Sequence, residues 1–324
     1  MMVIKLNTPW TIDLYNRIPN SGGVINFKGI DYKFEINNEA DTCDAWIVWG
    51  GLNDSIDKLI AVCSSENIFF ITDERFDGRK YNTSFLAQFN YVITGRADIN
   101  HKGVINSHEL NTWLLNKSFH DVCNIKFIEK SKSISVVSSD LTWLPGHKKR
   151  FAFVNRMIGH FKDRLDVYGR GFNEISDKWD ALYPYKYSIA IENNSLNGYF
   201  TEKISECYLA HVMPIYFGAP DIEMFFSGDT LLKIDLDDYK NGIRKIERLL
   251  EEDPYSELLE KIVQQKKIYL EKYHFFQAVS NILHERIDPK RKYSKSKIKI
   301  RAEKCFDHNY SLKRMIRFFG EKLP

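Results

Sequence analysis

Short runs of apolar residues, separated by longer polar stretches, recur along this chain and predict strands that alternate with helices. The runs are three to six residues long and rich in Ile, Val, Phe and Tyr, which is typical of buried strands. Alternation of such strands with helical stretches predicts an α/β fold with parallel sheets. The predicted strands are Ala45–Trp49, Ile68–Thr72, Tyr91–Thr94, Ser133–Ser138, Asp166–Tyr168, Tyr187–Glu192, Met213–Phe217 and Leu231–Ile234.

At 324 residues the chain is long enough for two domains, each with its own core. The strands fall into two series, and the charged stretch Glu129 to Lys132 between them is the expected linker. We therefore predict an amino-terminal domain at 1–132, a carboxyl-terminal domain at 133–285 and a basic segment at 286–324. The stretch Ser55 to Cys63 is expected to be helical, and Tyr239 to Tyr273 is expected to form two helices separated by Pro254.

The segment from 185 to 226 contains most of the interpretable chemistry. After the strand at 187–192, Asn197-Gly198 predicts a turn and the apolar spacing of 199–211 predicts an amphipathic helix, which Pro214 is expected to end. Glu192, Asn193, Tyr199, Glu202 and Lys203 should then gather at the carboxyl edge of the sheet, where ligands of open parallel sheets bind. A carboxylate there can hold a vicinal diol and Lys203 a phosphate. The alternative is that Glu202 and Lys203 merely suit a solvated helix start.

Several short motifs of this region resemble the donor-site signature of the α1,3-fucosyltransferases. In order along the chain they are Val167-Tyr168-Gly169-Arg170-Gly171, Tyr185-Lys186-Tyr187, Ile191-Glu192-Asn193, Tyr199-Phe200-Thr201-Glu202-Lys203 and Pro214-Ile215-Tyr216-Phe217-Gly218. The resemblance covers roughly residues 133 to 235. It implies the B-type glycosyltransferase architecture, in which two Rossmann-like domains face a cleft, and an inverting transfer of L-fucose from GDP-β-L-fucose. The implied acceptor hydroxyl is O3 of a glycan that contains N-acetylglucosamine or glucose, as in O-antigen or protein glycosylation.

The same resemblance assigns roles to individual donor-site residues. Arg150 matches an arginine that contacts the diphosphate together with the lysine matched by Lys203, and Glu202 matches the residue that holds the ribose. Tyr199 and Asn193 match further donor-contacting positions. Arg150 ends the basic run Lys148-Lys149-Arg150 before a helix predicted at 151–164; an exposed basic loop is the alternative interpretation.

The general base is expected from the amino-terminal domain. Asp73 and Glu74 follow the carboxyl end of the strand at 68–72. Glu74 matches the family glutamate that is regarded as the base. Two features depart from the family pattern: Asp73 stands where the family has a small residue, and the spacing from Glu74 to the next strand is long. Asp73 is therefore a second candidate for the base. A third interpretation is that both carboxylates cap a loop. Partial burial would raise the pKa of such a carboxylate and suit it to removing a proton near neutral pH.

No metal or other obligatory cofactor is expected, and GDP-fucose enters as a substrate. Asp235-Leu236-Asp237 superficially resembles a cation-binding D-x-D, but we interpret it as solvated acids at a strand end, because the donor motif belongs to the metal-independent B type. The five cysteines are widely spaced, without a C-x-x-C pair, and are expected to be reduced.

The first twenty residues contain no signal-peptide core, and no stretch of about 18 apolar residues occurs. We therefore expect a cytoplasmic protein. The segment from Arg286 to Pro324 contains thirteen Lys or Arg and four Asp or Glu. Such a basic segment either attracts anionic membrane from the cytoplasmic side or ends in a docked helix at Leu312–Phe319. Nucleic acid is not an expected partner, because no recognition motif accompanies the charge.

Two other functions remain open at this point. The signature reports mainly nucleotide and diphosphate contacts, so the same fold could transfer a sugar other than fucose. A catalytically inactive scaffold on a membrane surface is a candidate of a different class.

Overall fold

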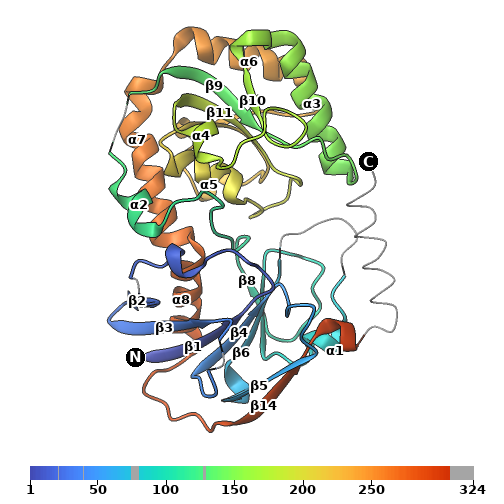
Figure 1. Ribbon diagram of the computed structural model, residues 1–324, viewed down its shortest axis with the longest axis vertical. Coiled ribbons are helices and arrows are strands. Elements are labelled where there is room, and N and C mark those ends of the chain that lie inside the picture. Colours follow the sequence, from blue (N-terminus) through green and yellow to red (C-terminus); the bar gives the residue numbers. More distant parts are fainter. Residues whose placement is uncertain (21, 39, 74–79, 127–128, 307–324) are drawn as a thin grey trace. The chain divides into compact units, whose positions relative to one another are not determined.

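The computed structural model describes residues 1–306 except 21, 39, 74–79 and 127–128 (Figure 1). The chain forms two compact units. The first consists of Met1–Leu110 and the described residues from Phe276 onward, and the second is Asn111–Phe275. The predicted domain boundaries were at 132 and 285. In the structure the chain leaves the first unit earlier, after Leu110, and returns to it at Phe276.

The first unit is built on a seven-stranded sheet in the order β2-β3-β1-β4-β6-β7-β8, shown in blue and cyan in Figure 1. All neighbouring strands are parallel except β2 and β3, which form a hairpin. The predicted strands at 45–49, 68–72 and 91–94 are confirmed, while β1, β2, β3 and β8 carried no prediction. The bounds are β1 Met2–Asn7, β2 Val24–Phe27, β3 Ile30–Ile36, β4 Ala45–Trp49, β6 Ile68–Ile71, β7 Tyr91–Thr94 and β8 Val104–Asn106.

The predicted helix at 55–63 is wrong, because this stretch contains strand β5, Lys58–Cys63. It pairs antiparallel with β14, Ser296–Arg301, in a separate two-stranded sheet. Ala61, Cys63 and Ile300 are buried there. The described part of the basic segment thus contains a strand of the first unit, and the docked helix predicted at 312–319 lies outside the described residues.

Helix α8, Phe275–Arg286, accounts for the return of the chain to the first unit. Phe276 packs edge-to-face against Phe34 of β3 with ring centroids 5.0 Å apart, and His284 Nδ1 lies 3.3 Å from the Tyr32 hydroxyl. Two further helices of the described residues are short: α1, Thr83–Leu86, lies in the first unit, and α2, Phe119–Asn124, lies in the second.

The second unit is built on a five-stranded parallel sheet in the order β10-β9-β11-β12-β13. The connection that leaves β9 runs to β10 on one side, whereas the connection that leaves β11 runs to β12 on the other side. The direction of the connections therefore reverses between β9 and β11, which makes this the topological switch point of the sheet. The bounds are β9 Lys132–Val137, β10 Asp166–Tyr168, β11 Tyr185–Ile191, β12 Met213–Phe217 and β13 Leu232–Lys233.

Helices flank this second sheet (Figure 1). They are α3 Pro145–Phe161, α4 Trp179–Leu182, α5 Glu202–Leu209, α6 Tyr239–Glu252 and α7 Tyr255–Ile268. Phe153, Val154, Ile204 and Tyr208 are buried in a core that reaches from the sheet to α7. The two helices predicted on either side of Pro254 are confirmed.

The helix predicted at 199–211 is shorter at both ends. Tyr199 and Phe200 are buried before its start, since the Glu192 carboxylate accepts hydrogen bonds from the Thr201 amide and hydroxyl and anchors the chain there. The helix ends before Pro214, which lies in β12 instead of terminating the helix. His211, at φ 55°, turns the chain between the two elements.

Below pH 6.5 we expect His211 to destabilise the protein. Burial and the ammonium groups of Lys266 and Lys130 lower the pKa of His211 to about 3, whereas the unfolded chain takes up this proton near pH 6.5. The stability is therefore present above pH 6.5 and is lost as the pH falls, by about 2 kcal/mol between pH 8 and pH 5. Urea unfolding of wild type and His211→Gln at both pH values measures it. An equal loss in both proteins would refute the assignment to His211.

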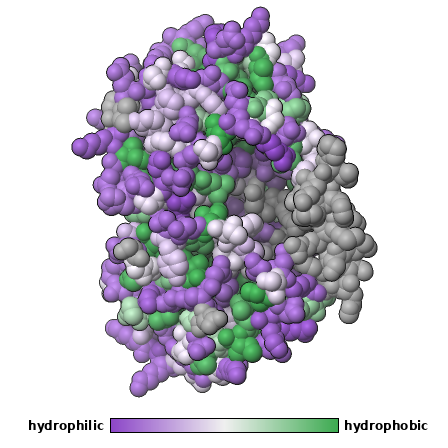
Figure 2. Space-filling view, in the orientation of Figure 1, coloured by the Kyte–Doolittle hydropathy of each residue, from purple (hydrophilic) through white to green (hydrophobic). Residues whose placement is uncertain are grey.

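Within the described residues, no helix is both long and apolar enough to cross a bilayer. The face of the molecule seen in Figure 2 is mostly hydrophilic, with apolar residues in small scattered groups. Cytoplasmic location and membrane contact stay predictions.

Candidate functional site

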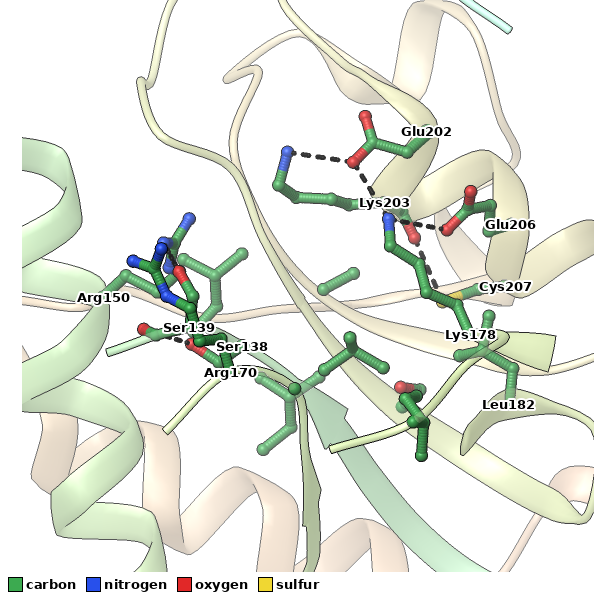
Figure 3. A pocket seen from close by; sticks show the side chains of 17 residues that line it. Ser138, Ser139, Arg150, Arg170, Lys178, Leu182, Glu202, Lys203, Glu206 and Cys207 are labelled. Atoms are coloured by element: carbon green, nitrogen blue, oxygen red, sulfur yellow. Dashed lines mark hydrogen bonds and ion pairs between the residues drawn. The ribbon is translucent and has the colours of Figure 1, made fainter. Parts of the chain in front are cut away.

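A cavity of about 350 Å³ opens at the carboxyl edge of the second sheet (Figure 3). Its walls come from the ends of β9, β10 and β11 and from helices α3 and α5, so it lies at the switch point between β9 and β11. This is where open α/β sheets bind their ligands. Polar side chains gather on two sides of it: Ser138, Ser139, Arg150 and Arg170 on one, and Lys178, Glu202, Lys203 and Glu206 on the other.

The first side is basic and rich in hydroxyl groups. Arg150, on the first turns of α3, is buried and donates to the Ser139 hydroxyl over 3.0 Å and to the Asn193 side-chain oxygen. Arg170 follows β10 and donates to Asp140 over 3.0 Å. The Arg150 guanidinium is thus oriented by hydrogen bonds to two side-chain oxygens, and a planar guanidinium suits the binding of a phosphate.

The second side is formed by the first turn of α5. Lys203 Nζ lies 2.9 Å from the Thr201 hydroxyl, 3.3 Å from Glu192 and 3.5 Å from Glu202. Burial would raise the pKa of Glu202, but the cations Lys203 and Lys178 outweigh it and hold this pKa below its ordinary value. Glu202 is therefore ionised at neutral pH and can accept two hydrogen bonds from a ligand.

Lys178, from the loop before α4, joins the two carboxylates that lie one turn apart on α5. Its amino group is 3.3 Å from Glu202 and 3.2 Å from Glu206. Glu206 is buried and also accepts a hydrogen bond from the Leu114 amide over 2.6 Å. Burial raises the pKa of Glu206. Burial alone would lower the pKa of Lys178, but the carboxylates of Glu206 and Glu202 outweigh it and raise this pKa. Lys178 thus compensates two negative charges at once.

The structure distributes the predicted donor residues unevenly. Arg150, Glu202 and Lys203 line the cavity. Asn193 holds Arg150 without lining the cavity, and Tyr199 is buried and does not line it either.

Lys148 and Lys149, by contrast, are exposed, and Lys149 pairs with Asp237 over 2.8 Å at the surface. Asp235 is exposed as well, as expected for solvated acids at a strand end. In the described parts of the chain no three His, Cys, Asp or Glu side chains come together as a metal site would require.

Of the two candidates for the base, Glu74 lies outside the described residues. Asp73 follows β6 in the first unit and is buried. Its carboxylate accepts a hydrogen bond from the Tyr81 hydroxyl, and the same hydroxyl accepts from the Asp73 amide over 3.0 Å.

Five of the polar side chains named above on the two sides of the cavity were absent from the sequence-based site: Ser138, Ser139, Arg170, Lys178 and Glu206. Arg170 was within a recognised motif and Ser139 in the loop after a predicted strand, so their position was a usable signal. Lys178 had none, since its partners lie 24 and 28 residues further along the chain.

The cavity lies within a stretch that matches a known family. Residues 127–282 match the family model described as the C-terminal part of glycosyltransferase family 10 (fucosyltransferase). Just under half of this chain is therefore similar to a family 10 glycosyltransferase domain. All the residues that line the cavity fall inside the matched stretch, so the resemblance seen in the donor motifs is confirmed.

Individual relatives match over shorter lengths. An α-(1,3)-fucosyltransferase of Helicobacter pylori is 35% identical over 71 residues, which are 22% of this chain and 14% of the relative. A putative fucosyltransferase-like protein of Arabidopsis thaliana is 37% identical over 75 residues, 22% of this chain and 15% of the relative. The matches thus span about a seventh of these relatives' length.

A crystal structure of an α1,3-fucosyltransferase has the same fold. It superposes with a TM-score of 0.51 at 15% identity, over 90% of this chain and 91% of the other. The predicted fold class, α/β with the B-type glycosyltransferase architecture, is confirmed at this level.

Proposed function

We propose that this protein is an inverting fucosyltransferase that moves L-fucose from GDP-β-L-fucose to a hydroxyl, O3 in our proposal, of an N-acetylglucosamine- or glucose-containing glycan. The observation that carries the proposal is the cavity inside the stretch that matches family 10, with Arg150 on one side and the Glu202–Lys203 pair on the other. A nucleoside diphosphate needs this combination of cations for its phosphates and a carboxylate for its ribose diol.

In this proposal the diphosphate lies between Arg150 and Lys203, and Ser139 donates a further hydrogen bond. Both cations are already held by neutral or acidic neighbours, so little reorganisation is needed when charge develops on the leaving group. Glu202, kept ionised by Lys203 and Lys178, accepts the ribose hydroxyls. No metal ion is required, because these two cations take its role toward the phosphates.

The transfer itself exchanges two bonds. The acceptor hydroxyl attacks the anomeric carbon from the face opposite the diphosphate, and the carbon–oxygen bond to the diphosphate breaks. GDP leaves with the bonding electrons, and a carboxylate takes the hydroxyl proton. Inversion converts the β-linked donor into an α-linked product. Glu74 is the proposed base, with Asp73 as the alternative.

Donor binding is the first test. Glu202→Gln and Lys203→Ala should each weaken GDP binding about tenfold or more in calorimetry, since each removes a charge-assisted hydrogen bond. Lys261→Ala is the matched control, because Lys261 pairs with Asp229 at the surface of the same unit. Wild-type affinity in both Glu202→Gln and Lys203→Ala would remove the basis of the proposal.

Turnover with a panel of nucleotide sugars identifies the donor, and linkage analysis of products from lactose and N-acetyllactosamine identifies the acceptor hydroxyl. A different preferred nucleotide sugar would retain the class of reaction and correct the sugar. Absence of GDP binding together with sedimentation on anionic vesicles would favour the scaffold.

The base is tested by Glu74→Ala. This variant should bind GDP normally and lose turnover; an active Glu74→Ala enzyme would pass the role of base to Asp73.

A further inference from the structure

Two cysteines of the first unit are neighbours in its core. Cys43 precedes β4 and Cys63 ends β5, and both are buried free thiols. We propose that this pair is a redox-sensitive modification site, at which hydrogen peroxide joins Cys43 and Cys63 in a disulfide. The inference does not depend on the proposed function, because both residues lie in the first unit and the donor cavity lies in the second.

The backbone places the two cysteines opposite each other. Thr42 and Val62 form a parallel bridge, and the Cys43 amide donates to the Val62 carbonyl over 3.0 Å. Cys43 and Cys63 are the next residues of these two segments, so their α-carbons lie about 5 Å apart, the spacing of neighbouring strands. A disulfide requires an α-carbon separation of about 4.4–6.8 Å, so this one can form with little movement of the backbone.

The two side chains meet on the same side of these segments. Cys43 is 1% exposed and Cys63 is fully buried, and both belong to one hydrophobic cluster. Their thiols are hydrogen-bonded to each other, so the sulfur atoms are already in contact in the reduced protein. Cys207, which is equally buried in the second unit, instead donates to the Lys203 carbonyl over 3.3 Å.

The surroundings favour ionisation of Cys43. The hydrogen bond from Cys63 and the ammonium groups of Lys5 and Lys295 lower the pKa of Cys43, against burial and the Asp44 carboxylate. The same hydrogen bond, together with burial, raises the pKa of Cys63. Because the thiolate is the reactive form of cysteine, Cys43 is the residue that attacks the oxidant and Cys63 the one that resolves the product.

The oxidation proceeds in two steps. The Cys43 thiolate attacks one oxygen of hydrogen peroxide, the O–O bond breaks, and hydroxide leaves and takes up a proton to become water. This gives a sulfenic acid on Cys43. The Cys63 sulfur then attacks the Cys43 sulfur, the S–O bond breaks, and the hydroxyl group leaves with the Cys63 proton as a second water. Two thiols are oxidised to one disulfide, and one peroxide is reduced to two waters.

Burial and the position of β5 restrict which oxidant can act. Thiols with such small exposed fractions are closed to a reagent as large as glutathione, whereas peroxide is nearly as small as water. β5 pairs along its length with β14 in a two-stranded sheet, which opens locally with less cost than the seven-stranded sheet. The disulfide closes the loop from Cys43 to Cys63 and so lowers the entropy of the unfolded chain.

Peptide mapping of the full-length protein tests this site. The protein is treated with hydrogen peroxide, its remaining thiols are blocked after denaturation, and its peptides are compared by mass spectrometry with and without reduction. We expect a cross-linked pair of peptides that contain Cys43 and Cys63, with Cys207 still reduced. The oxidised protein should melt about 5 °C above the reduced protein.

Two variants complete the test. Cys63→Ala should lose both the cross-link and the thermal shift, whereas Cys305→Ala, the matched control in the same unit, should keep both. Oxidation of the exposed Cys123 while Cys43 and Cys63 stay reduced would overturn the inference, as would sulfinic acid on Cys43 without a cross-link. If Cys63→Ala does not fold, the peptide map of the wild type decides alone.

Discussion

Lys178→Met is expected to destabilise the protein by about 3 kcal/mol at pH 8, because it leaves a buried carboxylate without its cation. Glu206 is the carboxylate concerned: it is buried, and its remaining partner is the Leu114 amide. Without Lys178, Glu206 and Glu202 repel each other across one turn of α5. This loss follows from the charge and not from side-chain volume, since methionine fills similar space.

The pH dependence distinguishes this cause from a packing defect. Burial already raises the folded-state pKa of Glu206, and loss of Lys178 raises it further. A carboxyl group with a raised folded pKa stabilises the fold while it is protonated, and this stability is lost as the pH rises through that pKa. The cost of Lys178→Met should therefore be smaller at pH 5 than at pH 8 in urea unfolding. A cost that does not change with pH would contradict the ion-pair role.

Lys178→Arg is the conservative control, because it retains the charge between the two carboxylates. In GDP titrations the methionine variant should also bind more weakly as the pH falls toward 5, since its Glu202 takes up a proton more readily. The arginine variant should show the weak pH dependence of wild type.

The second large effect is expected from Gly146→Ala, in the first turn of α3. A β-carbon at Gly146 would lie 1.9 Å from the Asn193 carbonyl oxygen, so helix or loop must move. Overpacking of this kind costs about 1–3 kcal/mol. Because Arg150 lies one turn further on and is held by the Asn193 side chain, the displacement should also weaken GDP binding by about tenfold.

Gly159→Ala provides the matched control on the same helix. Gly159 is exposed, and a β-carbon there would meet no atom within 4 Å. This variant should leave GDP affinity unchanged and stabilise the protein by about 0.5–1 kcal/mol, because alanine favours a helix interior. Equal GDP affinity of Gly146→Ala and Gly159→Ala would show that the contact of α3 with Asn193 does not position Arg150.

Strands in the middle of the two sheets could be predicted from the sequence with few errors. Those at 45–49, 91–94 and 213–217 have the predicted bounds, since strands covered on both faces appear as continuous apolar runs. The pair β5 and β14 could not be predicted, because each strand is recognisable only through a partner more than 230 residues away. The start of α5 was misplaced for a similar reason, since it depends on Glu192 nine residues earlier.

By itself, the sequence determined the α/β class, the donor motifs and three residues of the cavity, Arg150, Glu202 and Lys203, because these follow from local periodicity and short motifs. Only the tertiary structure decided how those charges are held. Lys178 and Glu206 complete the cavity from separate segments, and Asn193 restrains Arg150 from the far side of the switch point. It also decided which segments of each unit meet at one edge of its sheet, because parallel strands bring the ends of distant segments together. Ion pairing and burial act through space, and no local pattern of residues records them.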